Sequence, residues 1–145
     1  MKLTIVSNTI ILIATCAISM QTWAQNSSKT DLTCPSNWEM TDKQLQGEWT
    51  ASVSGDAQTA HIALGPHPEW KGNVKGTIRR GDTGYPMVGD LNQGAITLEE
   101  SSDGQRITGT WLGEVAADSC GREIRGSFQT SEDATPQDFV MRKQP

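Results

Sequence analysis

The sequence predicts an all-β fold: an eight-stranded antiparallel up-and-down meander, closed into a small barrel, with a short N-terminal plug. Three observations predict it. From Gly47 onward, apolar and polar residues alternate at period two. Turns rich in glycine and aspartate separate the alternating segments. These connections are too short for crossover helices, so successive strands are expected to run antiparallel.

The beginning of the chain has the features of a secretory signal peptide over residues 1–24. It contains Lys2 but no acidic residue, then an apolar stretch over residues 3–20, and Thr22-Trp23-Ala24 offers a cleavage site. We therefore expect a periplasmic or secreted protein without a membrane span. Two alternatives stay open: a membrane anchor, for which about 18 residues broken by polar ones are marginal, and lipidation at Cys16 in a sequence resembling a bacterial lipobox.

Composition bounds the rest of the chain. Removing the signal peptide from 145 residues leaves enough for one domain, which we place at 35–145 after a flexible tail at 25–34. The chain carries 17 acidic and 12 basic residues, a net charge of −5. Such a surface repels a phosphate backbone, which argues against nucleic acid as a partner.

Two cysteines remain after the signal peptide, Cys34 and Cys120. In an oxidising compartment we expect them to form a disulfide. The alternatives are two unrelated buried thiols or a zinc site, although neither cysteine lies in a C-x-x-C motif.

The first predicted element is the plug. Residues 35–45 contain no glycine and place Trp38, Met40 and Leu45 at uneven spacing, so at most one or two helical turns are expected.

Eight strands follow, each marked by alternation. The ranges, with marking residues, are 46–53 (Trp49, Ala51, Val53), 59–64 (Ile62, Leu64), 73–80 (Val74, Ile78), 85–91 (Met87, Leu91), 95–101 (Leu98), 105–115 (Ile107, Trp111), 120–129 (Ile124, Phe128) and 138–142. Residues 54–56, 81–84, 92–94 and 103–104 form turns that accept positive φ at low cost.

One unit, apolar-x-Gly-x-apolar, recurs in these strands. Its glycines are Gly47, Gly76, Gly89, Gly109 and Gly126. A glycine inside a strand usually marks a bend, a bulge or a close backbone approach. Their recurrence predicts a sheet that coils on itself and closes, which also removes exposed strand edges. A two-sheet sandwich is the alternative.

The predicted register distinguishes the two mouths of the barrel. Odd strands start at one mouth, so a disulfide between Cys34 and Cys120 would hold the plug, with Trp38, across it. We expect the other mouth to stay open.

At that open mouth the register points Arg80 and Glu100 inward beside Tyr85, with Trp111 and Phe128 as an apolar floor. Two interpretations remain. The first is an ion pair at the rim. The second is a ligand site in which Arg80 binds a carboxylate while Tyr85 and Glu100 orient it.

The segment Gly47-Glu48-Trp49, following a plug and opening a glycine-punctuated meander, resembles the calycin superfamily, which includes lipocalins, avidin-like proteins and small periplasmic metalloprotease inhibitors. The resemblance implies that Trp49 packs under a basic residue of the closing strand, here Arg142, as a cation–π pair. Residues 42–50 and 138–143 also resemble the ends of the protease inhibitors.

Biotin binding is not expected from this resemblance. Where the avidin pattern has an amide, a hydroxyl, an aromatic hydroxyl and a serine, this chain has Ala51, Gly55, Ile78 and Arg80.

Known catalytic motifs are not found in the sequence, neither serine nucleophile motifs nor phosphate loops nor H-E-x-x-H. His61 is expected to face solvent, with His67 beyond a proline, so no metal site is predicted. Glu99 and Glu100 are adjacent on a strand and point to opposite faces, so they cannot flank one glycosidic bond. We expect a protein that is not an enzyme and needs no cofactor.

Two functions follow as hypotheses. The leading one is a small-molecule binding protein that holds a partly apolar ligand at the open mouth. The rival is a proteinaceous inhibitor of a periplasmic or secreted hydrolase, acting through the tail at 25–30 and the loops of a solid barrel. A barrel interior filled by large side chains would favour the rival.

Overall fold

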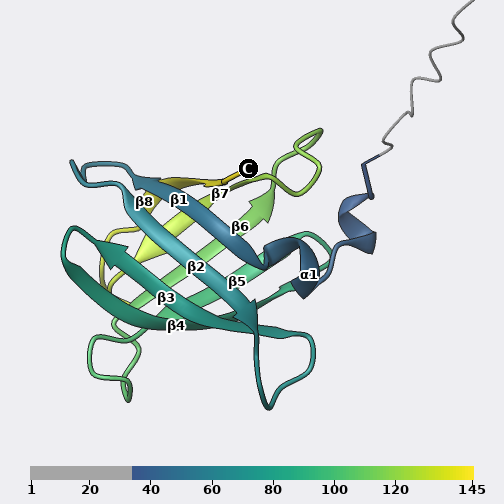
Figure 1. Ribbon diagram of the computed structural model, residues 1–145. Coiled ribbons are helices and arrows are strands. Elements are labelled where there is room, and N and C mark those ends of the chain that lie inside the picture. Colours follow the sequence, from purple (N-terminus) through teal and green to yellow (C-terminus); the bar gives the residue numbers. More distant parts are fainter. Residues whose placement is uncertain (1–33) are drawn as a thin grey trace, which may run out of the picture. The chain divides into compact units, whose positions relative to one another are not determined.

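The computed structural model describes residues 34–145 (Figure 1). The predicted signal peptide at 1–24, the lipidation candidate Cys16 and residues 25–33 of the predicted tail lie outside the described residues.

Eight antiparallel strands form a closed barrel in chain order, and β8 pairs with β1. They are β1 (Gly47–Val53), β2 (Ala60–Pro66), β3 (Asn73–Arg80), β4 (Thr83–Asn92), β5 (Ala95–Glu100), β6 (Gly109–Val115), β7 (Glu123–Gln129) and β8 (Gln137–Lys143). This confirms the predicted up-and-down barrel and excludes the sandwich.

Two strands begin several residues later than the sequence predicts. The strand expected at 105 starts at Gly109, because Asp103 Oδ1 accepts hydrogen bonds from the amides of Gln105 and Arg106 and holds these residues in a loop. The strand expected at 120 starts at Glu123, because Cys120 adopts a left-handed backbone with φ 53°.

The plug consists of two short helical turns, η1 (Asn37–Glu39) and α1 (Asp42–Leu45), as expected. Its buried residues are Met40 and Leu45. The indole Nε1 of Trp49 donates to the Leu45 carbonyl at 2.8 Å, which ties α1 to β1. Figure 1 shows α1 at the end of the barrel where β1 begins. Trp38 is 73% exposed, so the expectation that it covers this mouth is wrong.

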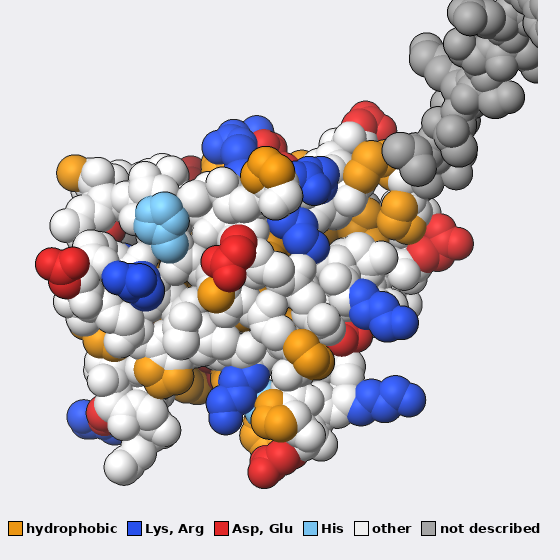
Figure 2. Space-filling view, in the orientation of Figure 1, with side chains coloured by type: hydrophobic (Ala, Val, Ile, Leu, Met, Phe, Trp, Pro, Cys, Tyr) orange, Lys and Arg blue, Asp and Glu red, His pale blue; other side chains and the backbone are white. Residues whose placement is uncertain are grey.

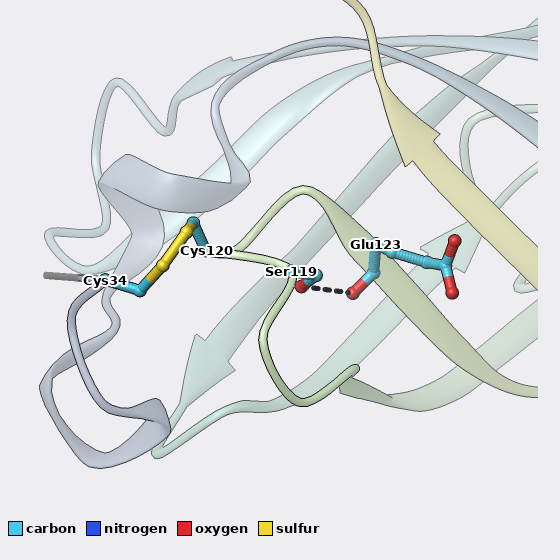
Figure 3. The surroundings of a disulfide bond; sticks show 4 residues. All are labelled: Cys34, Ser119, Cys120 and Glu123. Atoms are coloured by element: carbon cyan, nitrogen blue, oxygen red, sulfur yellow. Dashed lines mark hydrogen bonds between the residues drawn. A yellow bond between two sulfur atoms is a disulfide. The ribbon is translucent and has the colours of Figure 1, made fainter. Parts of the chain in front are cut away.

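The disulfide between Cys34 and Cys120 is present, as predicted, and excludes the free-thiol and zinc alternatives (Figure 3). It joins the start of the plug to the loop between β6 and β7. In that loop the Ser119 hydroxyl donates to the Glu123 carbonyl at 3.3 Å.

The basic residue over Trp49 is Lys143, so the prediction of Arg142 is wrong by one position. Lys143 is the register partner of Trp49 on β8, and its Nζ lies 5.4 Å from the indole centroid. Arg142 pairs with Thr50 in the register and therefore faces outward, where its Nε bonds Glu123 at 3.0 Å. Neighbouring strand residues alternate faces, so a shift of one residue decides which cation reaches the indole.

Large side chains occupy the barrel interior. Twelve apolar residues that the predicted register points inward are buried: Leu45, Trp49, Ala51, Val53, Ile62, Leu64, Ile78, Met87, Leu98, Trp111, Ile124 and Phe128. Phe139 and Met141 of β8, which were not predicted to face inward, are buried as well. Ile107, which marked the predicted sixth strand, is instead 57% exposed. The Trp111 ring lies 4.6 Å from that of Phe128 and 4.9 Å from that of Phe139, centroid to centroid.

Candidate binding site

The five residues predicted to bind a ligand come from five strands at the mouth remote from the plug. Arg80 ends β3, Tyr85 lies near the start of β4 and Glu100 ends β5, while Trp111 and Phe128 come from β6 and β7. Arg80 contacts Glu100 and both aromatic floor residues, and the rings of Trp111 and Phe128 contact each other. Tyr85 is partly buried against the core.

Arg80 and Glu100 form a two-pronged ion pair. Arg80 Nη1 lies 3.2 and 3.1 Å from the two carboxylate oxygens of Glu100, and Nη2 lies 3.1 Å from Oε2. The side chains are only 18% and 6% exposed. Glu100 thus engages Nη1 and Nη2 of the guanidinium, as the ion-pair interpretation expects.

Arg80 also covers the aromatic floor. Its guanidinium carbon lies 5.7 Å from the Trp111 ring centroid and 5.6 Å from that of Phe128, within cation–π range. The mouth that we expected to be open is therefore occupied by its own side chains.

One polar atom of this cluster lacks a partner. The buried indole Nε1 of Trp111 makes no hydrogen bond within residues 34–145. Such a buried donor costs about 1 to 3 kcal/mol. An acceptor supplied by a water or by a ligand would satisfy it. Sequence reasoning identified Trp111 as floor but not this unpaired donor, because alternation gives the face of a side chain and not its ring orientation.

Sequence reasoning also missed the exposed apolar side chains. Trp38, Trp70, Ile107 and Leu112 are between 46% and 73% exposed. Figure 2 shows hydrophobic side chains at the surface among the charged ones on the visible face. For Trp70 a signal was available, since it stands in a segment with two prolines and a glycine that cannot continue a strand.

The two histidines differ in environment. His61 is exposed on β2, as predicted. His67 is half-buried, and its Nδ1 accepts hydrogen bonds from the amides of Glu69 and Trp70 at 3.2 and 3.1 Å. Across residues 34–145 no three His, Cys, Asp or Glu side chains are grouped so that they could hold a metal ion. Within the same range, none of the helices has the length and apolar character needed to cross a membrane.

Comparison of this chain with protein-family models, with curated proteins and with solved structures finds no match.

Proposed function

We propose that this protein is an exported, non-catalytic inhibitor of a periplasmic or secreted hydrolase, with the barrel as a rigid scaffold. The observation that carries the proposal is a filled barrel that presents an exposed tryptophan, Trp38, beside the disulfide of its plug. A protein with a filled interior recognises partners with its outer surface and loops.

The plug is firmly attached around Trp38. Cys34 is bonded to Cys120, and Asn37 Nδ2 donates to the Val115 carbonyl at 3.2 Å. The carboxylate of Glu39 accepts from the amide and hydroxyl of Ser36 at 3.0 and 2.7 Å, which caps the turn that carries Trp38. Because the backbone that carries Trp38 is already held, little backbone entropy is lost on binding. Tryptophan is also enriched at the energetic centres of interfaces.

Two features of the sequence also support the inhibitor proposal. The polar residues 25–30 lead into Cys34, and any partner contact they make would start from an anchored point. The first and last sequence segments of the domain, 42–50 and 138–143, resemble those of calycin protease inhibitors. This resemblance is an analogy of pattern and fold class.

Two variants test the proposal, deletion of residues 25–30 and Trp38→Ala. Mature protein is assayed at micromolar concentration against a metalloprotease, a serine protease and lysozyme. We expect inhibition of one of them, lost in the deletion and weakened at least about tenfold by Trp38→Ala. Thermal stability should be unchanged in both variants, since neither alters the core. Equal inhibition by both variants, or no inhibition by the full-length protein, would overturn the proposal.

The unpaired Trp111 donor favours a second candidate, a small partly apolar ligand at the mouth closed by Arg80. Because Glu100 neutralises Arg80, such a ligand would carry a neutral acceptor such as a carbonyl rather than a carboxylate. Native mass spectrometry of protein isolated from its own host tests this candidate. A bound mass that disappears in Trp111→Phe, which lacks the N–H, supports it, whereas an unliganded mass contradicts it.

A further inference from the structure

A groove of about 450 Å³ lies over the outer surface of β3, β4 and β5, between one loop from each end of the barrel. Its floor includes Pro86 and Val88 of β4. The loop between β2 and β3 borders it with Trp70, and the loop between β5 and β6 borders it with Ile107. Trp70 is 59% and Ile107 57% exposed, so the two apolar side chains at its borders are available to a ligand.

Trp70 is held in one orientation. Its indole stacks on the His67 imidazole with centroids 4.4 Å apart and planes inclined by 9°. His67 Nδ1 accepts hydrogen bonds from the amides of Glu69 and Trp70, and the backbone amide of His67 donates to the Asn73 carbonyl at 2.9 Å. The indole is therefore a preorganised platform and not a freely rotating surface side chain.

The opposite loop is also fixed by its own hydrogen bonds. Asp103 accepts from the amides of Gln105 and Arg106 at 2.9 and 2.8 Å, and its Oδ2 bonds Arg106 Nε at 3.1 Å. These bonds fix the conformation of the loop that carries Ile107 at the border of the groove.

The charges of the groove identify the kind of occupant. Two of the lining charges are already paired, Glu100 with Arg80 and Arg106 with Asp103. Lys75 therefore faces the two remaining lining carboxylates, Glu69 and Glu99. A lining with one carboxylate in excess does not attract an anion, and carboxylates accept hydrogen bonds from hydroxyl groups, so the groove suits a ligand that is rich in hydroxyls and carries no negative charge.

A peptide is the less suitable uncharged occupant. The sheet is a closed barrel, so no free strand edge is available to pair with the backbone of an added strand. A sugar ring has an apolar C–H face for an aromatic platform and hydroxyls for the amide and charged side chains between the two loops.

We propose that this groove binds an uncharged saccharide, with one ring stacked on Trp70. The proposal uses residues that the inhibitor proposal does not use, so either can fail without the other.

The test measures binding by calorimetry while mature protein is titrated with two neutral saccharides, cellotetraose and tetra-N-acetylchitotetraose. An anionic oligogalacturonate and an uncharged apolar peptide are titrated for comparison. We expect one of the neutral saccharides to bind, with affinity about tenfold lower in Trp70→Ala and largely kept in Trp70→Phe. Trp38→Ala is the matched control and should bind as the native protein does.

Three results would overturn the proposal. These are no binding of either neutral saccharide at about 10 mM, an equal loss in Trp38→Ala, and preferential binding of the oligogalacturonate or the peptide. Loss of saccharide binding in Trp70→Ala with unchanged hydrolase inhibition would separate the two functions.

Discussion

At the scale of single residues, removing one partner of the Arg80–Glu100 ion pair should lower stability more than removing both partners. Glu100→Leu leaves the largely buried guanidinium of Arg80 without its carboxylate. We expect it to lower the free energy of unfolding by about 3 kcal/mol.

The double variant Arg80→Met with Glu100→Leu is the control, because it removes both charges and keeps apolar volume over Trp111. Urea denaturation should show that it recovers most of the loss. A single variant as stable as the native protein would show that solvent screens the pair.

Lys143 gives a pH dependence whose sign follows from its surroundings. Burial, with a smaller contribution from the charge of Arg122, lowers the pKa of Lys143 from 10.5. Between the lowered pKa and 10.5 the unfolded chain binds more protons than the folded one, so stability rises with pH in that window.

Lys143→Met keeps most of the stem over Trp49 and removes the titration. The unfolding free energy of the native protein minus that of this variant should therefore rise as pH rises toward 10.5. Urea denaturation at a series of pH values measures it. A difference that shrinks would mean that the Trp49 face and the Gln44 carbonyl, 2.6 Å from Nζ, hold the charged form more strongly than burial opposes it.

Residue positions were predictable from alternation where the strand register was unambiguous. Arg80 and Glu100 were expected to point inward together, and they pair. The cation over Trp49 was assigned one residue too early, because that assignment came from the calycin resemblance and not from alternation. Period two from Phe139 and Met141 places Lys143 on the inner face. The His67 and Trp70 stack depends on loop hydrogen bonds that no period reveals.

At the scale of elements, the strand glycines explain how the sheet coils. A Cβ on Gly76 would overlap the Ala63 carbonyl of β2 and lie 3.0 Å from the Leu64 Cα, since these backbones approach closely. Gly65 on β2 has ordinary space, with the Lys75 carbonyl oxygen at 3.9 Å.

Gly76→Ala should therefore destabilise the protein by about 3 kcal/mol or more, because backbone must move. Gly65→Ala, the matched control on the adjacent strand, should change stability by about 0.5 kcal/mol at most. Thermal unfolding followed by circular dichroism measures both. Similar values for the two variants would refute the close-approach interpretation of Gly76.

Strand existence and order were predictable at this scale, but two strand starts were not. Period-two patterning continued through residues 105–108, where the Asp103 side chain binds backbone amides and prevents pairing with the next strand. Local side-chain hydrogen bonds compete with the sheet in this way, and polarity alone does not distinguish the outcomes.

At the scale of the whole molecule, barrel closure was predictable from the recurrent glycines and from the need to remove strand edges. Filling of the interior was not, because it depends on how side chains such as Phe139 and Trp111 stack across the barrel. Because side chains fill the interior, the inhibitor and saccharide proposals both place binding on outer surfaces of the molecule.

Two connections link parts of the molecule that lie far apart in the sequence. The pairing of β1 with β8 closes the barrel, and the disulfide joins Cys34 to Cys120, 86 residues away. The barrel closes without the disulfide, which links only the plug to the loop before β7. Cys34→Ser with Cys120→Ser should therefore keep the circular dichroism spectrum of the barrel at 25 °C and lower the free energy of unfolding by up to about 4 to 5 kcal/mol. Reductant should lower the melting temperature of the native protein to that of the double variant and leave the variant unchanged. A native spectrum lost on reduction would mean that β1 and β8 cannot close the barrel alone, and an unchanged melting temperature would mean that the plug detaches without affecting the core.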